Sequence, residues 1–562
     1  TASNNTAVGT SALLANTTSD YNVAIGTETL DANTTGARNT GVGTFALSDN
    51  VTGGYNVALG YAALNQNTSN YNTAIGYEAL LRNVGAANNT AVGYRALDHN
   101  TTGQYNVAVG TSTLDANTTA DNNAAFGFEA LTSNTTGTAN TSVGRLALGS
   151  NTTASNNTAV GNAALYANTT GTENTAVGAL CMDANTTGNN NVGVGREAFG
   201  QNTTGSNNTA LGDAALNANT TASNNTAVGK NALLANTTGD ENTAVGALCL
   251  DANTTGHDNT AIGHKALGAN TTGQQNIAVG NDALDANTTA DYNVAVGFAA
   301  LGVNTTGDNN VAIGLSALDA NTTASNNVAV GGASLGANTT GTRNVAVGAA
   351  ALTDNTTADG NTAVGYDCLL RNTTGDQNTA VGQSSLDANT TGIRNHAFGV
   401  EALTDCTTAD NNTALGHTAL ANVTTGSNNT GIGYNAGSVL TTGATNVIVG
   451  VSCQPSAASG AGQIVMGNTV TGVGNDNFTF GAGSTDSNIE FGATSITAPS
   501  DIRLKEDIQD EEVGLDFIND LRPVTFQWKK EKDIPSDMKA YKEGSEERTM
   551  NGKYNHGFIA QE

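Results

Sequence analysis

Charged residues, aromatic residues and proline are scarce in this sequence. Only 12% of the residues are charged and 5% are aromatic, and there are one tryptophan and four prolines. Aromatic side chains supply much of the buried area of a globular core, so this composition excludes a series of large globular domains. Lysine, glutamate and proline, which disordered segments favour, are also rare, so ordinary disorder is excluded as well.

Other absences narrow the classes of function. The sequence contains no run of 18 apolar residues, so it encodes no membrane-spanning helix. The formal net charge of −28 opposes nucleic-acid binding, which needs clustered lysine and arginine. No signal peptide is present and the chain begins within a repeated motif at Thr1, so we expect it to be a fragment of a longer protein.

The composition changes near residue 450 and again near residue 500. All four prolines lie at residue 455 or later, and half of the 20 basic residues lie in the last 63 positions. We therefore expect a repeat region over residues 1–450, an irregular β neck over residues 451–499 and a small α+β domain over residues 500–562.

A 17-residue repeat fills the first region. Glycine recurs at residues 9, 26, 43 and 60 and, after one spacing of 16, continues every 17 residues to 450 and 467. The consensus is x-N-T-A-V-G-x-x-A-L-x-A-N-T-T-G-x, and we number its positions from the glycine as position 0. Asparagine occupies position −4 in 27 of the 28 copies, as at Asn22, Asn191 and Asn344, and a second asparagine column lies at position +7, as at Asn33.

A repeat of this length predicts one coil of a parallel β-solenoid. Seventeen residues are too few for a helical hairpin, whereas two short strands and two turns fit. The T-A-V-G segment alternates as a half-buried strand does, and A-N-T-T-G is rich in turn residues. We expect valine and leucine to point inward, and the two asparagine columns to form side-chain ladders between coils ~4.8 Å apart. Roughly 27 coils would make an all-β rod on the order of 130 Å long.

The energetics of one coil predict a homotrimer. Burial of one leucine and one valine contributes roughly 1.5–3 kcal/mol each, whereas ordering 17 residues costs at least about 17 kcal/mol of backbone entropy. Further burial between chains is therefore expected. Glycine at position 0 and alanine or glycine at position −2 share a strand face and would let another backbone approach closely, so we expect the chains to touch there, for example at Gly212.

The N-T-A-V-G-x-x-A-L repeat resembles the N-S-x-A-I-G-x-x-A repeat in the heads of YadA-type trimeric adhesins. The resemblance covers about 450 residues. The adhesin repeat is shorter, and the additional residues here fall in the N-T-T-G turn. The resemblance implies left-handed parallel β-rolls that pack as trimers.

The repeat region offers little reactive chemistry. Four cysteines occupy position +3, where a small buried residue is expected, and a fifth replaces a ladder asparagine (Cys181, Cys249, Cys368 and Cys453, and then Cys406). A metal or disulfide framework is the lesser alternative, because no C-x-x-C pair occurs. We expect no metal and no cofactor. Charge pairs such as Asp98–His99 are expected to be solvated, and no aromatic or charged cluster marks a receptor-binding patch.

Three sequence blocks near the end of the chain carry a second resemblance. They are Ser500-Asp-Ile-Arg-Leu-Lys505, Leu521-Arg-Pro-Val-Thr-Phe-Gln-Trp528 and Gly557-Phe-Ile-Ala-Gln-Glu562. In this order they resemble S-D-x-R-L-K, L-x-P-V-x-F-x-W and G-x-I-A-Q-E, the signature of the intramolecular chaperone domain of phage endosialidases and tail fibres. In that family three copies fold the fibre ahead of them as a trimer and then sever themselves just before the serine.

This second resemblance implies a self-cleavage site. Ser500 would be the nucleophile, Lys505 its basic partner and Pro499–Ser500 the scissile bond. From the residues alone, Ser500 could instead cap a helix that begins at Asp501. The sequence departs from the family in two places, because a proline precedes the serine and the family continues into further helices beyond the position of Glu562.

These features favour a trimeric virion fibre, such as a phage tail fibre or spike, that attaches to a host cell-surface receptor such as a glycan. A cellular trimeric surface adhesin, which would be extracellular, is an alternative. An ice-binding solenoid is another, based on threonine columns at positions +8 and +9, although adjacent residues point to opposite faces and only one column can be exposed on a given face. No carboxylate pair recurs at a fixed position, which argues against a glycan-cleaving enzyme, so any enzyme activity would be confined to self-cleavage.

Overall fold

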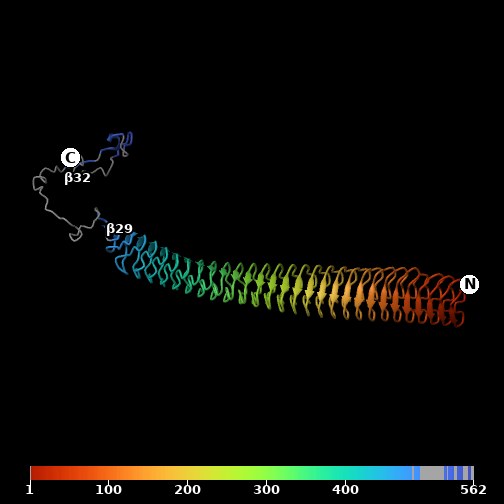
Figure 1. The fold of residues 1–562 in the computed structure, drawn as a ribbon. Helices are drawn as coiled ribbons and strands as arrows, with labels where there is room; N and C mark the ends of the chain where they lie inside the picture. Colours follow the sequence, from red (N-terminus) through yellow and green to blue (C-terminus); the bar gives the residue numbers. More distant parts are fainter. Residues whose placement is uncertain are drawn as a thin grey trace. The chain divides into compact units, whose positions relative to one another are not determined.

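The computed structural model describes residues 2–483, 486–493, 524–527, 529–536, 541–547 and 555–557. The chain divides into two compact units, Thr1–Thr497 and Ala498–Glu562, and each is described by itself. The first unit is a long stack of coils whose strands lie side by side, and we call it the shaft (Figure 1). None of the described residues belongs to a helix with the length and apolar character that a membrane crossing requires.

Short strands recur along the shaft once per coil. They are β1 (Thr6–Val8), β2 (Val23–Ile25), β3 (Thr40–Val42), β4 (Val57–Leu59), β5 (Thr73–Ile75), β6 (Thr90–Val92), β7 (Val107–Val109), β8 (Ala124–Phe126), β9 (Thr141–Val143), β10 (Thr158–Val160), β11 (Thr175–Val177), β12 (Val192–Val194), β13 (Thr209–Leu211), β14 (Thr226–Val228), β15 (Thr243–Val245), β16 (Thr260–Ile262), β17 (Ile277–Val279), β18 (Val294–Val296), β19 (Val311–Ile313), β20 (Val328–Val330), β21 (Val345–Val347), β22 (Thr362–Val364), β23 (Thr379–Val381), β24 (His396–Phe398), β25 (Thr413–Leu415), β26 (Thr430–Ile432), β27 (Val447–Val449) and β28 (Ile464–Asn468).

Each strand pairs in parallel with the strand of the next coil, which confirms the all-β parallel solenoid. The register advances by one repeat, so that Ala159 lies opposite Ala176. Where the sequence has its single 16-residue spacing, Ala58 still lies opposite Ala74 in an unbroken ladder. The missing residue is therefore absorbed in the turn between the strands, as loops generally allow.

One strand per coil is found in the described shaft, rather than the two that the sequence analysis predicted. The reason is the backbone of positions +2 and +4, which takes left-handed φ values, such as 52° at Glu28 and 54° at Leu30. Alternating left-handed residues fold this segment into a turn instead of an extended strand. Backbone hydrogen bonds between coils continue through it, for example from the Leu30 N–H to the Ala46 carbonyl at 3.1 Å.

The interior of the coil is narrow and is filled by leucine and alanine. Leucine at position +4 is fully buried, as predicted, and so are alanines at positions −2 and +3, such as Leu216, Ala210 and Ala215. The prediction that valine at position −1 points inward is wrong, because this side chain is on the outer face of the strand, as at Val177. Alternation along a strand puts neighbours on opposite faces, and the narrow coil accepts the smaller of the two.

Both predicted asparagine ladders are present. At position +7, the Asn33 side-chain amide donates to the Asn16 side-chain oxygen at 3.2 Å and to the Gly36 carbonyl at 3.0 Å. At position −4, the side-chain oxygen accepts a backbone N–H of the next coil, as between Asn174 and Asn191 at 3.0 Å. The remaining predicted ladder residues follow the same pattern, with amide donation from Asn22 to Gly36 at 3.0 Å and from Asn344 to Ala358 at 2.8 Å.

The glycine at position 0 is needed for contact between coils of one chain. At Gly212, φ is 144°, and an added Cβ would lie 2.6 Å from the carbonyl carbon of Gly229 in the next coil. Alanine at position −2 is buried inside the coil. The prediction that the alanine shares an outer face with the glycine is therefore wrong, and the glycine is needed for contact within the chain, whereas contact between chains stays a prediction.

The stack ends in a short hairpin, and the second unit contributes a separate small sheet. Strand β29 (Asn477–Ala482) pairs in parallel with β28, and β30 (Ser487–Glu490) returns antiparallel to β29. In the second unit, β31 (Val524–Phe526) pairs antiparallel with β32 (Asn555–Gly557), and η2 (Glu531–Asp533) is a single helical turn.

Candidate functional site

An uncharged surface runs along the outer face of the strands, with an unbroken apolar row at position −1 and mostly threonine or valine at position −3. Positions −3 and −1 point outward in every strand from β1 to β28, and no side chain at either position is fully buried. Position −1 is always valine, isoleucine, leucine, phenylalanine or methionine. Leu211, for instance, is 45% exposed. We call the two positions together the shaft stripe.

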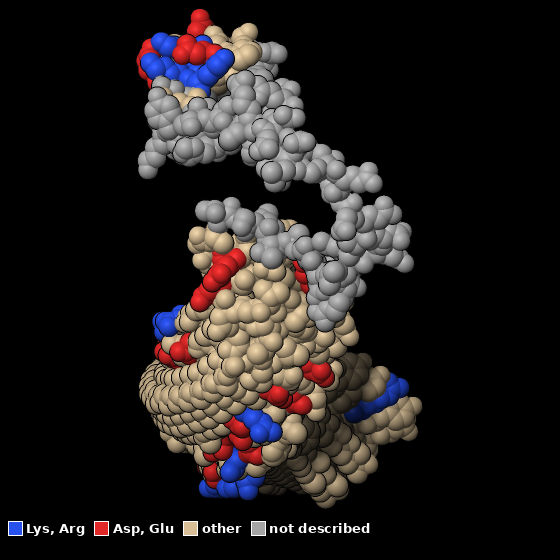
Figure 2. Space-filling view, turned by 90° about the vertical axis from the view of Figure 1, so that its left-hand side faces the viewer, with Lys and Arg blue, Asp and Glu red and all other residues tan. Residues whose placement is uncertain are grey.

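The shaft stripe carries no charge in any coil. Lysine, arginine, aspartate and glutamate occur at neither position in the 28 strands, although the chain contains 68 such residues in total, 20 basic and 48 acidic. His396 is its one titratable side chain. In Figure 2 the visible surface of the shaft is likewise mostly uncharged, with acidic and basic side chains gathered in short groups. Scattered exposed valines are ordinary, whereas an unbroken apolar row of this length is typical of surfaces that bind another molecule.

Aromatic side chains gather beside the stripe, although the sequence analysis found no aromatic cluster that marks a receptor-binding patch. They occupy position −5 and position +1, which flank the strand, and we call these the border positions. Tyr61, Tyr77 and Tyr94 stack in one border column with ring centroids 5.1 and 5.4 Å apart. In the other column Tyr55 stacks on Tyr71 at 5.1 Å. Aligning the repeats and reading the two border columns down the chain would have found both rows.

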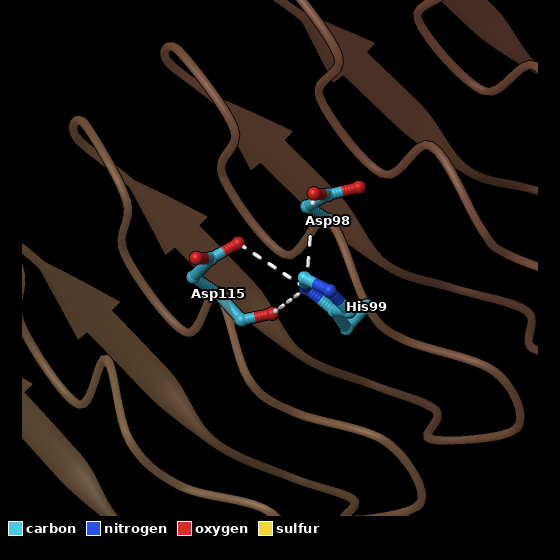
Figure 3. A group of neighbouring side chains, drawn as sticks. All are labelled: Asp98, His99 and Asp115. Atoms are coloured by element: carbon cyan, nitrogen blue, oxygen red, sulfur yellow. Dashed lines mark hydrogen bonds and ion pairs between the residues drawn. The ribbon is translucent and has the colours of Figure 1, made fainter.

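An ion-pair network lies on a different part of the surface, in the turns that follow β6 and β7 (Figure 3). His99 Nδ1 lies 3.7 Å from Asp98 Oδ2 and 3.5 Å from Asp115 Oδ1. Arg95 Nη2 lies 2.9 Å from Asp98 Oδ2, and the hydrogen bond with Asp98 is the main reason that the arginine pKa is raised. The Asp98 side chain is only 1% exposed, so the prediction of a solvated charge pair is wrong.

Two carboxylates and an imidazole are a donor set that a divalent transition metal accepts. Their ligand atoms all lie within 4.8 Å of one another. However, Arg95 already provides a positive charge to Asp98 and lies 3.9 Å from Asp115, so the acidic groups have a counter-ion from the chain itself. We therefore interpret the cluster as a structural ion-pair network.

Half-buried aspartates recur at position +5. Burial is the main cause that raises the pKa of these carboxyls, which are Asp183, Asp251, Asp285, Asp319 and Asp387.

A separate, exposed contact joins Glu241 and Asp258, which both lie in the border column at position −5. The hydrogen bond with Asp258 raises the pKa of Glu241, whereas the hydrogen bond with His257 lowers that of Asp258.

The cysteines and threonines of the repeat serve the coil itself. All five cysteines are free and buried, as predicted, and burial raises the pKa of Cys181, Cys249 and Cys406 to about 12, which disfavours the reactive thiolate.

At position +8, threonine hydroxyls donate hydrogen bonds to the next coil, as from Thr186 to the Thr203 carbonyl at 2.8 Å. Threonine at position +9, such as Thr187, is exposed. The outward hydroxyl array expected for ice binding is thus a single column wide.

The predicted cleavage residues Pro499, Ser500 and Lys505 lie outside the described residues. Parts of the other two sequence blocks are described, and the structure brings them together. Strand β31 comes from the second block and β32 overlaps the start of the third, and Val524 lies opposite Gly557 in their ladder. Residues of the second block and the first residue of the third block thus pair through their backbones in the second unit.

Exposed ion pairs surround η2 in the second unit. Glu531 accepts from Lys542 Nζ at 2.9 Å and from the Ser545 hydroxyl at 2.8 Å. Glu546 pairs with both Lys530 and Lys532, and the hydrogen bond from Lys530 is the first cause that lowers its pKa to about 2. These pairs join the segment after η2 to η2 itself and to Lys530, the residue before it.

Comparison with known families gives one match. Residues 500–562 match the family described as chaperone of endosialidase. No curated protein and no solved structure matches the chain. The match covers the segment for which the sequence blocks implied this family, whereas the resemblance of the repeats to trimeric adhesins stays an expectation.

Proposed function

We propose that this chain forms the shaft of a virion tail fibre or spike that attaches to a host cell surface. Residues 500–562 would act as an intramolecular chaperone that assembles three copies and then separates from the shaft by self-cleavage. The observation that carries the proposal is the chaperone-of-endosialidase match placed directly after a long parallel solenoid.

The shaft stripe supports assembly with further copies of the chain. An apolar row along 28 coils needs a partner that offers an equally long apolar row with the same spacing, and another copy of the shaft meets this condition. The absence of charge from the stripe favours the same partner, because copies of a chain with net charge −28 repel one another wherever their charges meet. Three copies with their stripes facing a common axis would cover all of them.

Self-cleavage is the chemical part of the proposal. The Ser500 hydroxyl would attack the Pro499 carbonyl carbon while the Lys505 amine accepts the hydroxyl proton, and the Pro499–Ser500 C–N bond would break as the serine nitrogen takes up a proton. Water would then hydrolyse the resulting ester and leave a shaft that ends at Pro499. A neutral lysine is required, and burial in the assembled domain would favour it.

Mass spectrometry and sedimentation of the expressed protein test this function. The chain is produced together with any sequence that follows residue 562 in its gene, beside Ser500→Ala and Lys505→Ala variants. We expect the unaltered protein to yield a trimeric shaft ending at Pro499, and both variants to yield uncut trimers. Cleavage at the same bond in Ser500→Ala would reject the nucleophile, and a stable folded monomer would reject the assembly.

A cellular trimeric adhesin is the second candidate, favoured by the repeat pattern alone. The shaft would serve either role, and the chaperone match is the observation that supports the virion fibre. Detection of the protein in purified virus particles, rather than in bacterial surface extracts, would distinguish the two.

A further inference from the structure

Two buried carboxylate oxygens in the ion-pair network of Figure 3 accept no hydrogen bond. They are Oδ1 of Asp98 and Oδ1 of Asp115. The Asp98 side chain is only 1% exposed, and Asp115 Oδ1 lies 3.5 Å from His99 Nδ1. Buried polar atoms in native proteins almost always have a partner, so two such oxygens beside an imidazole indicate a site for a ligand.

The residues of this cluster are exceptional within the repeat. Aspartate occupies position +5 in two consecutive coils only at Asp98 and Asp115, and histidine occupies position +6 only at His99. The His99 backbone N–H donates to the Asp115 carbonyl at 3.1 Å. The ladder between the coils of β6 and β7 therefore fixes the three side chains beside one another, as a binding site requires.

Arg95 balances only part of the negative charge of the network. Its Nη2 atom lies 2.9 Å from Asp98 Oδ2 and 3.9 Å from Asp115 Oδ1, and its Nε atom lies 3.9 Å from Glu78. Among the described residues, no other lysine or arginine pairs with these carboxylates. With His99 neutral, three carboxylates and one guanidinium leave an excess of two negative charges, which is the charge that one divalent cation neutralises.

We propose that the ion-pair network also binds a zinc ion through Asp98, His99 and Asp115, although the sequence analysis expected no metal. Zinc binds imidazole nitrogen and carboxylate oxygen tetrahedrally at about 2.0–2.2 Å, so its ligand atoms lie about 3.3–3.6 Å apart. His99 Nδ1 lies 3.5 Å from Asp115 Oδ1 and 3.7 Å from Asp98 Oδ2, so small side-chain rotations complete the set, with water as the fourth ligand. The imidazole favours zinc over calcium and magnesium, which prefer oxygen ligands.

Zinc binding changes the position of one proton on the imidazole. His99 Nδ1 lies 3.1 Å from the Asp115 backbone carbonyl, and it must offer a lone pair to the metal, so the ring proton is then carried by Nε2. The Asp115 carbonyl keeps the hydrogen bond from the His99 backbone N–H. Asp98 offers one carboxylate oxygen to the metal while the other stays with Arg95, which orients it.

The zinc ion would join two coils of the shaft. Asp98 and His99 lie in the turn after β6, whereas Asp115 lies in the turn after β7. A ligand that binds the folded coils but not the unfolded chain stabilises the fold in proportion to its affinity and concentration. The site lies apart from the shaft stripe, so it does not depend on the proposed trimer.

Calorimetric titration of Zn²⁺ into the whole chain, after removal of metals with a chelator, tests the site. We expect His99→Gln and Asp115→Asn each to weaken binding of one zinc ion per chain by at least about 100-fold, since even residues behind metal ligands change affinity by about 10- to 100-fold. His264→Gln removes an exposed histidine from another coil and should leave zinc binding unchanged. Equal zinc binding by all four proteins would overturn the site and assign the ion to adventitious contacts with surface carboxylates.

Hydrogen exchange distinguishes loss of the site from a defect in folding. Zinc should slow amide exchange in the coils of β6 and β7 of the unaltered protein, and this effect should vanish in His99→Gln. Exchange around β14 should be the same in both proteins, which shows that the variant is folded. No effect of zinc on the unaltered protein, or equal protection by Ca²⁺, would overturn the proposed zinc site.

Arg95→Met provides a test in the opposite direction. It removes a positive charge next to the proposed ion but none of the three ligands, so zinc binding should tighten by about tenfold. Zinc should also recover stability that this variant loses, because the ion then supplies the positive charge beside Asp98. Weaker zinc binding in Arg95→Met would overturn the charge balance on which the site rests.

Discussion

The side-chain oxygen of Asn185 accepts a hydrogen bond from the Asn202 side-chain amide, 17 residues later, at 2.7 Å. Asn185 in turn donates to the Asn168 side-chain oxygen at 2.9 Å and to the Gly188 carbonyl at 3.1 Å. One fully buried amide thus satisfies groups in three coils. The ladder helps to specify which face of the repeat turns inward, because a buried asparagine amide is tolerated only where neighbouring coils supply its hydrogen-bond donors and acceptors.

Asn185→Ala is expected to destabilise the coils around it. The Asn202 amide and the Asn168 oxygen lose their partner while still buried, at about 1–3 kcal/mol for each unsatisfied group. Native-state hydrogen exchange of the neighbouring coils measures this locally, which suits a repeat protein whose coils open in parts. Thr204→Ala, in an exposed turn of the same region, is the control and should leave exchange unchanged.

Gly212→Ala is expected to disrupt the shaft even in a single chain. The added methyl would overlap the Gly229 carbonyl group. In addition, the φ of 144° at residue 212 is one that alanine rarely adopts. Together the two effects are expected to lower the free energy of unfolding by about 2–6 kcal/mol. Gly332→Ala is the matched control, since the nearest atom to its new methyl is 4.0 Å away. Similar thermal unfolding of the two variants would contradict the close coil contact.

Period, ladders and the buried leucine could be predicted from the sequence, because each is a column that repeats at a fixed spacing. The choice between alanine and valine for the interior could not. Alternation assigns them to opposite faces, and only the width of the coil decides that Ala176 is inside and Val177 outside. The left-handed φ of Leu30 was equally hidden, because leucine seldom adopts it and a short apolar segment suggests a strand.

The candidate surfaces were missed for a related reason. Once Val177 and its equivalents are outside, the apolar column becomes a surface, and Tyr55 and Tyr61 become its flanks. Asp98 looked like a solvated charge in the sequence, because its burial beside Arg95 is a property of the folded turn after β6. The three chaperone blocks, in contrast, could be recognised directly in the sequence, and all three lie within the matched residues 500–562.

Because burial raises the pKa of the half-buried aspartates, we predict that acidification stabilises the coils that contain them. Burial raises the pKa of Asp319 above its ordinary value of 3.8, and glycines occupy the same repeat position in the coils on either side, at Gly302 and Gly336. Between the unfolded and the folded pKa, the native state holds a proton that the unfolded state has lost. Stability from this group is therefore fully present below the unfolded pKa and is lost as pH rises through the folded pKa.

Thermal unfolding at neutral pH and near pH 4 checks this sign. Asp319→Asn should be more stable than the unaltered shaft at neutral pH, and its melting temperature should rise less on acidification. Asp354→Asn removes the same charge from an exposed position and serves as the control. An equal response of both variants to pH would show that general charge repulsion, rather than the burial of Asp319, is responsible.

Arg95→Met is expected to weaken the coils of β6 and β7. It removes the cation 2.9 Å from the buried Asp98 carboxylate, at about 1–3 kcal/mol, which is less than for a fully buried pair because Arg95 is itself a third exposed. Adding Asp98→Asn removes the unpaired charge and should recover most of the loss in a double-mutant cycle. No recovery would mean that packing of the arginine stem, not the ion pair, stabilises the turn.

Leu211→Glu is expected to prevent assembly of the trimer without preventing the coils of each chain from forming. Leu211 lies on the shaft stripe and its side chain points away from its own coil, so the change leaves Leu216, Ala210 and the ladders in place. In the proposed trimer it brings three carboxylates toward one axis, where burial without a partner is strongly unfavourable. Sedimentation should show loss of the trimer, while hydrogen exchange still reports protected ladder amides. Thr204→Glu adds the same charge in an exposed turn and should leave the trimer intact. A trimer that survives Leu211→Glu but not Thr204→Glu would place the interface on the turns, and the uncharged stripe would then need another partner.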